Sequence, residues 1–342
     1  MESVEFILPV VQAHEPCWSK VSTETCKIIR QVSTSSRVFV VETSLAIHPK
    51  RFIYRVLGSS DTLNLTQCSS IMKRLAKSKL APTIYLETES YRLEEFLENF
   101  RNMSRSEIVE PHIACKIAGK LREMHAIDMS DILDAQSIVC VENGTKWRNV
   151  AKRGFADYSQ FVRKNECKQA AKALGKEYLQ MFYEVLPKES PVVLAHMDTC
   201  FLNVLYQEEK DEVYLLDFDY TGYCYRGFDL AMLLTDVKYD YNFPDFPFYQ
   251  YQAEAYPGDQ VLASCIKAYG EGIDMFIECK RCMIAANYLW AMWSFSMYKE
   301  ENKGFDVLSY GLLRFREFLE GYEEFKNEGP EGIKRQGIQY FE

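Results

Sequence analysis

The stretch Leu194–Ala231 constrains this chain of 342 residues more than any other. It holds two groups of polar residues, and each group comes directly after an apolar run, Pro191–Leu194 or Val213–Leu216. Short apolar runs bounded by turn residues predict buried strands. We therefore expect the polar groups to lie where strands end and loops begin. The residues concerned are His196, Asp198, Asn203, Asp217 and Asp219.

The segment after Asn203 predicts a β-hairpin. Val204–Tyr206 reads as one strand, Gln207–Glu212 as a polar connection, and Val213–Leu216 as the returning strand. Such a hairpin brings Asn203 close to Asp217, and an amide oxygen beside a carboxylate suits Mg²⁺, which takes further ligands from phosphates and water. Asp198 stands across the loop, placed to accept a proton from a substrate hydroxyl. An acid after a strand is by itself more often a turn former or helix cap, so the joint pattern carries this interpretation.

This block resembles the catalytic core of the choline/ethanolamine kinases, relatives of the aminoglycoside phosphotransferases. The resemblance covers roughly residues 25–320 and is most specific from His196 to Tyr241. It implies an α+β, two-lobed, protein-kinase-like fold with a small β-rich N-lobe and a larger, mainly helical C-lobe. We expect residues 1–90 to form the nucleotide-binding lobe and residues 91–342 the catalytic and acceptor-binding lobe.

The resemblance also implies ATP and Mg²⁺ as cofactors and gives each polar residue a role. Asp198 would orient and deprotonate the acceptor hydroxyl, Asn203 and Asp217 would hold the metal, and Asp219 would support the metal or its waters. Asp229 opens a predicted helix, where a carboxylate can cap free N–H groups. The family pattern implies instead that Asp229 braces the catalytic loop.

The nucleotide side departs from the family pattern. Relatives have glycines where Gln31 and Val32 stand, although the serines that follow could still offer donors to a phosphate. Arg55 matches the basic residue that replaces the kinase strand lysine, and its guanidinium can reach two phosphate oxygens; the alternative is a surface arginine on an edge strand. The predicted cofactor-binding residues are Arg55, Ser33, Ser35, Ser36, Glu94 and Phe96, the last two in an expected hinge over Tyr91–Leu97.

The glutamate that relatives pair with this basic residue is also missing. Cys68 stands at the corresponding position of a predicted helix over Thr66–Lys79 and cannot form an ion pair. Glu24 and Glu42 are possible substitutes, and the sequence does not choose between them.

Trp290 and Trp293 indicate the acceptor pocket. They are three residues apart and share one face of a predicted helix, a spacing more often found in a core than in a ligand cage. The family resemblance favours the cage, because aromatic faces and carboxylates can hold a quaternary ammonium that donates no hydrogen bond. The implied pocket favours choline, with ethanolamine slower, and consists of Asp198, Tyr220, Asp236, Tyr241, Trp290, Trp293 and Tyr310.

Composition narrows the remaining classes. Apolar residues make up 47% and charged residues 26%, as in ordinary globular proteins, and the formal charge of −9 argues against a nucleic-acid partner. No apolar stretch reaches the roughly 20 residues of a membrane helix, and the first residues lack a signal-peptide pattern. Eleven scattered cysteines suggest reduced thiols and a cytoplasmic location. We also expect a homodimer, one helix over Lys168–Leu186, and an irregular tail after Asn327.

The sequence thus predicts an ATP- and Mg²⁺-dependent kinase of choline, or of ethanolamine as well, that makes a phospholipid head group. A kinase of another small hydroxylated compound, such as an aminoglycoside, is the second interpretation. A catalytically weak binding protein that kept the fold is the third, favoured by Cys68 and the missing glycines and opposed by Asp198, Asn203 and Asp217.

Overall fold

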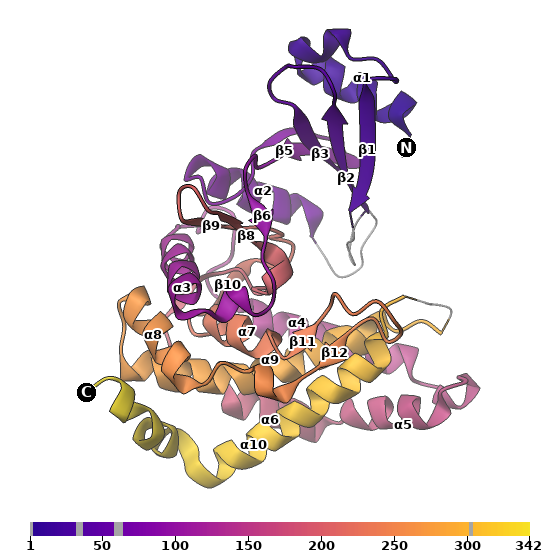
Figure 1. Cartoon of the computed structure of the whole chain (residues 1–342). Helices are drawn as coiled ribbons and strands as arrows, with labels where there is room; N and C mark the ends of the chain where they lie inside the picture. The colour runs from indigo at the N-terminus through magenta and orange to yellow at the C-terminus, as the bar shows by residue number, and fades with distance from the viewer. Residues whose placement is uncertain (1–2, 32–36, 58–63, 301–303) are drawn as a thin grey trace. The chain divides into compact units, whose positions relative to one another are not determined.

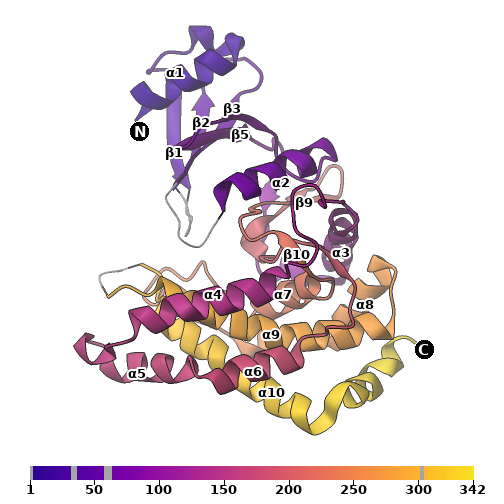
Figure 2. The same cartoon turned by 180° about the vertical axis from the view of Figure 1, so that it is seen from behind.

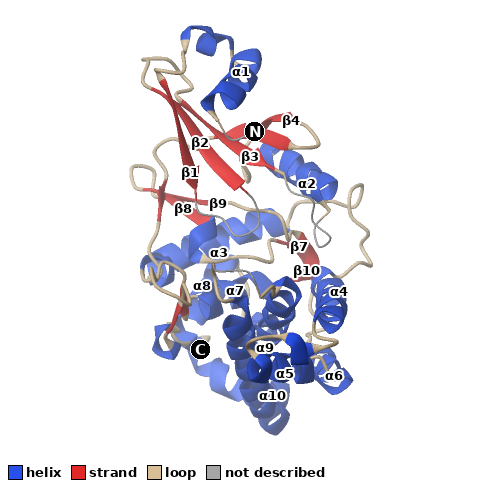
Figure 3. Ribbon diagram, turned by 90° about the vertical axis from the view of Figure 1, so that its right-hand side faces the viewer, coloured by secondary structure: helices blue, strands red, loops and turns tan. Residues whose placement is uncertain are grey.

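The computed structural model describes residues 3–31, 37–57, 64–300 and 304–342 (Figure 1). The chain divides into two compact units, Met1–Phe100 and Arg101–Glu342. The strands of the first unit form one larger sheet, whereas helices dominate the second (Figure 3). This arrangement confirms the α+β class predicted from the sequence.

The first unit is an antiparallel sheet of five strands in the order β1-β2-β3-β5-β4. Residues on β3 alternate: Phe52, Tyr54 and Val56 are buried, whereas Arg55 points to the opposite face. The buried side chains form a core with helix α1. The elements are α1 (Val4–His14), the 3₁₀ helix η1 (Pro16–Lys20), β1 (Cys26–Gln31), β2 (Arg37–Thr43), β3 (Arg51–Val56), α2 (Leu65–Lys77), β4 (Ile84–Glu87) and β5 (Tyr91–Glu95).

The strands of the second unit are short and position the loops that concern function. β7 pairs with β10, β8 pairs with β9 and with β6, and β11 pairs with β12, all antiparallel. The β8–β9 hairpin is the one predicted from the sequence. The strands are β6 (Arg101–Asn102), β7 (Val192–Ala195), β8 (Val204–Gln207), β9 (Glu212–Leu215), β10 (Gly222–Tyr225), β11 (Tyr239–Asp240) and β12 (Gln250–Tyr251).

Helix α9 forms the centre of the second unit, and α4, α6, α7 and α10 pack against it (Figure 2). Seventeen of its residues are buried, which explains its weak amphipathic pattern. The helices are α3 (Pro111–His125), α4 (Val139–Gly154), α5 (Lys164–Ala173), α6 (Lys176–Val185), α7 (Phe228–Asp236), α8 (Asp259–Tyr269), α9 (Ile273–Met297) and α10 (Val307–Gly337). The 3₁₀ helices are η2 (Glu107–Val109), η3 (Tyr158–Gln160), η4 (Phe201–Asn203), η5 (Ala253–Ala255) and η6 (Ile338–Tyr340).

Three expectations about elements were wrong. The helix expected over Lys168–Leu186 is two helices, α5 and α6, that break at Leu174 and Gly175, since glycine is a poor helix former. The tail expected to be irregular is helical as far as Gly337, because Gly329 accommodates a kink at a φ of +61° and Pro330 restarts the helix. The segment expected as a hinge contains strand β5, which lies inside the sheet.

Candidate active site

The loop after β7 carries the first group of predicted residues. β7 ends at Ala195, and Asn203 is the last residue of the short helix η4. The amide of Leu216 donates to the carbonyl oxygen of Asn203 at 2.9 Å, which fixes the open end of the β8–β9 hairpin. Asn203 and Asp217 therefore lie at the same end of the hairpin, as the sequence predicted. Asp217 itself adopts a φ of +64°, a conformation that residues other than glycine rarely adopt.

Asn203 holds the carboxylate of Asp198. Its side-chain nitrogen Nδ2 donates to Asp198 Oδ2 at 3.0 Å and to the Asp198 carbonyl oxygen at 2.9 Å. Both bonds use Nδ2, so Oδ1 is the amide atom suited to bind a hard cation. Burial and the negative charges of Asp217 and Asp236 raise the pKa of Asp198 well above its usual value, despite the bond from Asn203. Asp198 is thus a strengthened base in a fixed orientation.

Asp229 braces the loop that carries Asp198. Its buried carboxylate accepts the backbone N–H of His196 at 2.7 Å and that of Met197 at 2.8 Å. His125 Nε2 lies 2.9 Å from the same carboxylate, and the Thr199 hydroxyl donates to the Asp229 carbonyl oxygen at 2.6 Å. The carboxylate thus caps the catalytic loop, and the bracing role implied by the family pattern is confirmed. Burial acts to raise the pKa of Asp229, but His125 and the donated hydrogen bonds outweigh it and lower the pKa.

His196 is a structural residue of the loop. Its Nε2–H donates to the carbonyl oxygen of Leu216 at 2.8 Å, and its Nδ1 accepts the backbone N–H of Asp198 at 3.3 Å. Burial lowers the pKa of the imidazole, so the ring is neutral and holds one tautomer. The ring ties the loop to the end of the hairpin.

The acids around Asp198 are suited to a metal ion that takes only some of its ligands from the protein. The charges of Asp217, Asp236 and Asp219 all act on Asp198, so each of these carboxylates lies near Asp198. Within the described residues, no three His, Cys, Asp or Glu side chains form a metal site by themselves. The oxygen donors Asn203 Oδ1 and Asp217 nevertheless fit Mg²⁺, which usually keeps few protein ligands and adds phosphate oxygens and waters.

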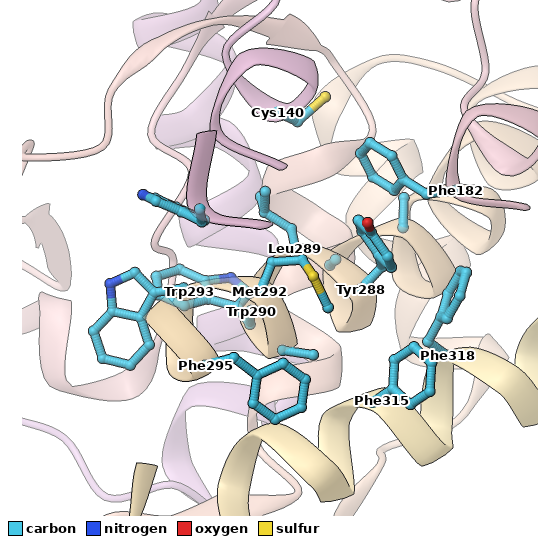
Figure 4. Packing of buried hydrophobic residues seen from close by; sticks show 14 of the residues in the cluster. Cys140, Phe182, Tyr288, Leu289, Trp290, Met292, Trp293, Phe295, Phe315 and Phe318 are labelled. Atoms are coloured by element: carbon cyan, nitrogen blue, oxygen red, sulfur yellow. The ribbon is translucent and has the colours of Figure 1, made fainter. Parts of the chain in front are cut away.

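The predicted indole pair lies at the edge of the large core of the second unit. Trp293 Nε1 donates to the Tyr220 hydroxyl at 2.8 Å, and Trp290 Nε1 donates to the sulfur of Met232 at 3.1 Å. The Trp290 ring lies edge-on to Tyr220 and to Trp293, with centroids 5.5 and 5.4 Å apart. Figure 4 shows the two tryptophans at one end of the packed cluster, with Phe182 and Phe318 at the other. The pair therefore belongs to the core and also borders Tyr220, while its role in a ligand cage stays a prediction.

Three of the other predicted acceptor residues, Asp236, Tyr241 and Tyr310, form a polar group. It begins on α7, one helical turn after Met232. Met232, which contacts Trp290, and Asp236 are four residues apart on α7 and share a face. The Tyr241 hydroxyl donates to Asp236 Oδ1 at 2.7 Å and lies 3.0 Å from the Tyr310 hydroxyl. Arg314, which was not predicted, forms an ion pair with the same oxygen of Asp236. The structure therefore brings Asp236, Tyr241 and Tyr310 together, and the guanidinium of Arg314 lies among them.

The first unit gives Arg55 an acid partner. Arg55 Nε lies 3.3 Å from Glu94 Oε1, and Arg92 Nε lies 3.0 Å from the same oxygen. Neither Glu24 nor Glu42 is this partner; Glu42 faces Arg51 across the sheet. The Glu94 side chain is thus engaged with two arginines, while the Phe96 ring stacks under the guanidinium of Arg51 at 4.2 Å. Ser33, Ser35 and Ser36 lie outside the described residues.

The family model for choline/ethanolamine kinase matches residues 29–319. The chain belongs to the choline/ethanolamine kinase family. As a member of this family it is a kinase, a transferase that uses ATP. Rat choline/ethanolamine kinase is 25% identical over 300 residues, which cover 81% of this kinase and 74% of the relative. Mouse choline kinase alpha is 26% identical over 274 residues, which cover 72% of this kinase and 58% of the relative.

Solved structures confirm the protein-kinase-like fold of this kinase. The choline kinase of Cryptosporidium parvum matches with a TM-score of 0.80 at 17% identity, covering 98% of this chain and 100% of that chain. The ethanolamine kinase of Plasmodium vivax matches with a TM-score of 0.70 at 16% identity, covering 90% of this chain and 87% of that chain. An aminoglycoside phosphotransferase-like protein from Ralstonia eutropha shares the fold with a TM-score of 0.61. At these identities the likeness shows the fold alone.

Sequence reasoning missed two residues of this kinase that contact predicted site residues. Arg314 follows Tyr310 by four residues on α10, so the two share a helical face, and this spacing could have indicated the contact. His125 ends α3, far from Asp229 in sequence, and no local pattern marks it as a partner. Within the described residues, no helix is long and apolar enough to cross a membrane.

Proposed function

We propose that this kinase transfers the γ-phosphoryl group of ATP to the hydroxyl of choline, and more slowly to that of ethanolamine. The observation that carries this proposal is the geometry of Asp198, whose carboxylate is held by Asn203 and lies near the charge of Asp236. Asp198 can accept a proton from a hydroxyl, and Asp236 with its neighbouring aromatic rings can hold a positive charge. Together they suit a small molecule that carries both a hydroxyl and a positively charged nitrogen.

In this reaction the hydroxyl oxygen of the acceptor forms a bond to the γ-phosphorus, and the bond from that phosphorus to the departing ADP oxygen breaks. Asp198 takes the proton of the hydroxyl, for which its raised pKa and fixed orientation suit it. Asn203 and Asp217 would hold Mg²⁺ with support from Asp219, and the bound ion would neutralise phosphate charge. Asp229 and His196 keep the loop in the conformation that presents Asp198.

The proposed nucleotide contacts come from the first unit. Arg55 binds phosphate oxygens, and Glu94, which also pairs with Arg92, positions the Arg55 guanidinium. The backbone around Glu94 and Phe96 lies near the adenine, and Ser33, Ser35 and Ser36 offer donors to the phosphates. These roles follow from the family pattern.

The proposed acceptor pocket contains two kinds of contact. The rings of Tyr220, Trp290 and Trp293 suit the methyl groups of a quaternary nitrogen, because an aromatic face attracts a cation without needing a hydrogen bond. Tyr241, Tyr310 and Asp236 form the polar side of the pocket. We further propose a cytoplasmic location, which all eleven cysteines support because they are free thiols. A homodimer remains a prediction.

The proposal is tested with a coupled assay of ADP release in the presence of Mg²⁺. Choline, ethanolamine, an aminoglycoside and a sugar are compared as acceptors, with Asp198→Asn as the inactive control. We expect ADP release with choline, slower release with ethanolamine, and none above background with the other two. Release with the aminoglycoside alone would identify a different kinase, and no release with any acceptor would favour a binding protein that kept the fold.

A further inference from the structure

A positively charged side chain is built into the proposed acceptor pocket. Arg314 of α10 is fully buried, and its guanidinium lies 3.9 Å from the centre of the Tyr239 ring. Its Nε donates to the Tyr310 hydroxyl at 2.9 Å, and its Nη1 donates to Asn287 Oδ1 at 3.0 Å. The remaining nitrogen, Nη2, is bonded to Asp236. The guanidinium is therefore fixed on every side and cannot swing away when a ligand binds.

The two oxygens of Asp236 differ in their surroundings. Oδ1 accepts from both Arg314 and Tyr241. Oδ2 is buried and has no hydrogen-bond partner among the described residues. A buried anionic oxygen without a donor is unfavourable, which a ligand can relieve by supplying one. Tyr241 is half-buried and is bonded to the same carboxylate through its hydroxyl.

The charge of Asp236 is also largely offset. Arg314 lies in direct contact with it, and the nearby Lys238 and Glu317 form an ion pair of their own. A substrate cation at Oδ2 is attracted by the carboxylate and repelled by the guanidinium at similar range. Little net Coulomb attraction remains, whereas a directional hydrogen bond to Oδ2 keeps its full strength.

We propose that Arg314 is a specificity-determining residue, which makes Asp236 recognise an N–H group on the substrate nitrogen rather than its charge. The class of substrate favoured by this contact is a primary, secondary or tertiary ammonium, which can donate to Oδ2. A quaternary ammonium has no N–H and gains from the aromatic rings instead. This inference rests on the proposed function and concerns how the same pocket separates its acceptors.

The test uses acceptors that differ only in their N–H groups: ethanolamine, N-methylethanolamine, N,N-dimethylethanolamine and choline. Asp236→Asn is nearly isosteric and replaces the accepting Oδ2 by an NH₂ group that cannot accept. We expect kcat/KM to fall by about tenfold or more for the three N–H acceptors, as for a lost charge-assisted bond, and by less than about threefold for choline. Asp245→Asn removes the same charge from an exposed site and should change no acceptor.

A uniform loss across the series would overturn the inference, because it would show that Asp236 acts by unscreened charge. No loss for any acceptor would also overturn it, because Oδ2 would then not face the substrate. If wild-type protein phosphorylates none of the four, the proposed function itself fails, which is a separate outcome.

A second variant tests the guanidinium directly. Arg314→Gln keeps donors for Asp236 but removes the positive charge, and thermal unfolding shows whether it is folded. In folded protein kcat/KM for choline should rise several-fold, because choline carries a charge but no N–H and the carboxylate charge is no longer offset. An unchanged kcat/KM for choline in folded protein would contradict the role of Arg314. If the variant does not fold, the Asp236→Asn series decides.

Discussion

Arg55 on β3 and Glu94 on β5 form an ion pair within one sheet, with Nε and Oε1 3.3 Å apart. Arg92, 1% exposed, shares the same carboxylate oxygen and also donates to the Ser69 hydroxyl of α2 at 3.1 Å. The strand thus provides the acid that relatives place on the helix. Helix α2 is still tied to the network, through Ser69 rather than Cys68.

This pairing predicts the effects of two substitutions on ATP binding. Glu94→Gln should weaken ATP binding by about tenfold, because Arg55 loses the carboxylate charge that holds its guanidinium in place. Cys68→Glu should not tighten binding, since the pair already exists, and should lower stability because Cys68 is buried. Calorimetric titration with ATP measures the first effect and thermal unfolding the second. Tighter ATP binding by the Cys68→Glu variant would show that Arg55 lacks an effective partner.

The roles proposed for the two acids of the catalytic loop and hairpin predict different defects. Asp198→Asn should lower kcat by at least about a hundredfold, the usual scale for a lost general base, and leave ATP binding nearly intact. Asp217→Ala should instead abolish the Mg²⁺-dependent part of nucleotide binding. Steady-state kinetics and nucleotide titrations with and without Mg²⁺ separate the two. Near-normal turnover of the Asp198→Asn variant would refute its assignment as the proton acceptor.

Asp229 predicts a defect in stability that depends on pH. The two oxygens of Asp229 accept the backbone N–H groups of His196 and Met197, and Asn keeps only one acceptor oxygen. One of these buried N–H groups therefore loses its partner in Asp229→Asn, which should lower the free energy of unfolding by about 1–3 kcal/mol. The pKa of Asp229 is lowered in the folded protein, so its ionised form stabilises the fold above the unfolded pKa of about 3.9. This stabilisation is lost as the pH falls through the folded pKa.

Urea unfolding at pH 7 and at several pH values below 4 measures both effects. The Asn variant should be less stable than wild type at pH 7, and the difference should shrink as the pH falls. The matched control is Asp134→Asn, because Asp134 is exposed and Asn keeps the Oδ1 that accepts from Gln136. A constant difference at all pH values would show that the charge of Asp229 plays no part.

Local pattern was enough to predict the β8–β9 hairpin and the loop that precedes it. Three apolar residues before a polar connection and four after it fix the register, which places Asn203 beside Asp217. The partner of Arg55 could not be predicted in this way. It depends on β5 lying between β3 and β4, and strand order in a sheet is set by packing across the whole unit. The pairing of Arg314 with Asp236 on another helix illustrates the same limit, because a buried arginine looks like a surface residue until its distant partner is known.

The last prediction concerns the aromatic side of the acceptor pocket. Trp293→Ala removes a ring proposed to contact the methyl groups of choline, and cation–π attraction with methyl burial is worth about 1–2 kcal/mol. The Michaelis constant for choline should therefore rise about tenfold, and that for ethanolamine should rise much less. This pattern is the reverse of the one expected for Asp236→Asn. Trp293→Phe separates two causes, since it keeps an aromatic face but loses the bond to the Tyr220 hydroxyl.

If the indole face matters, Trp293→Phe should retain most of the choline affinity. If the bond to Tyr220 matters instead, Phe should be as poor as Ala, because Tyr220 would then be free to move in both variants. Equal losses for choline and ethanolamine in the Ala variant would show that Trp293 supports the core rather than the acceptor. In that case Trp293 would have the role that its position in the packed cluster of α9 suggests, and choline recognition would depend on the remaining rings.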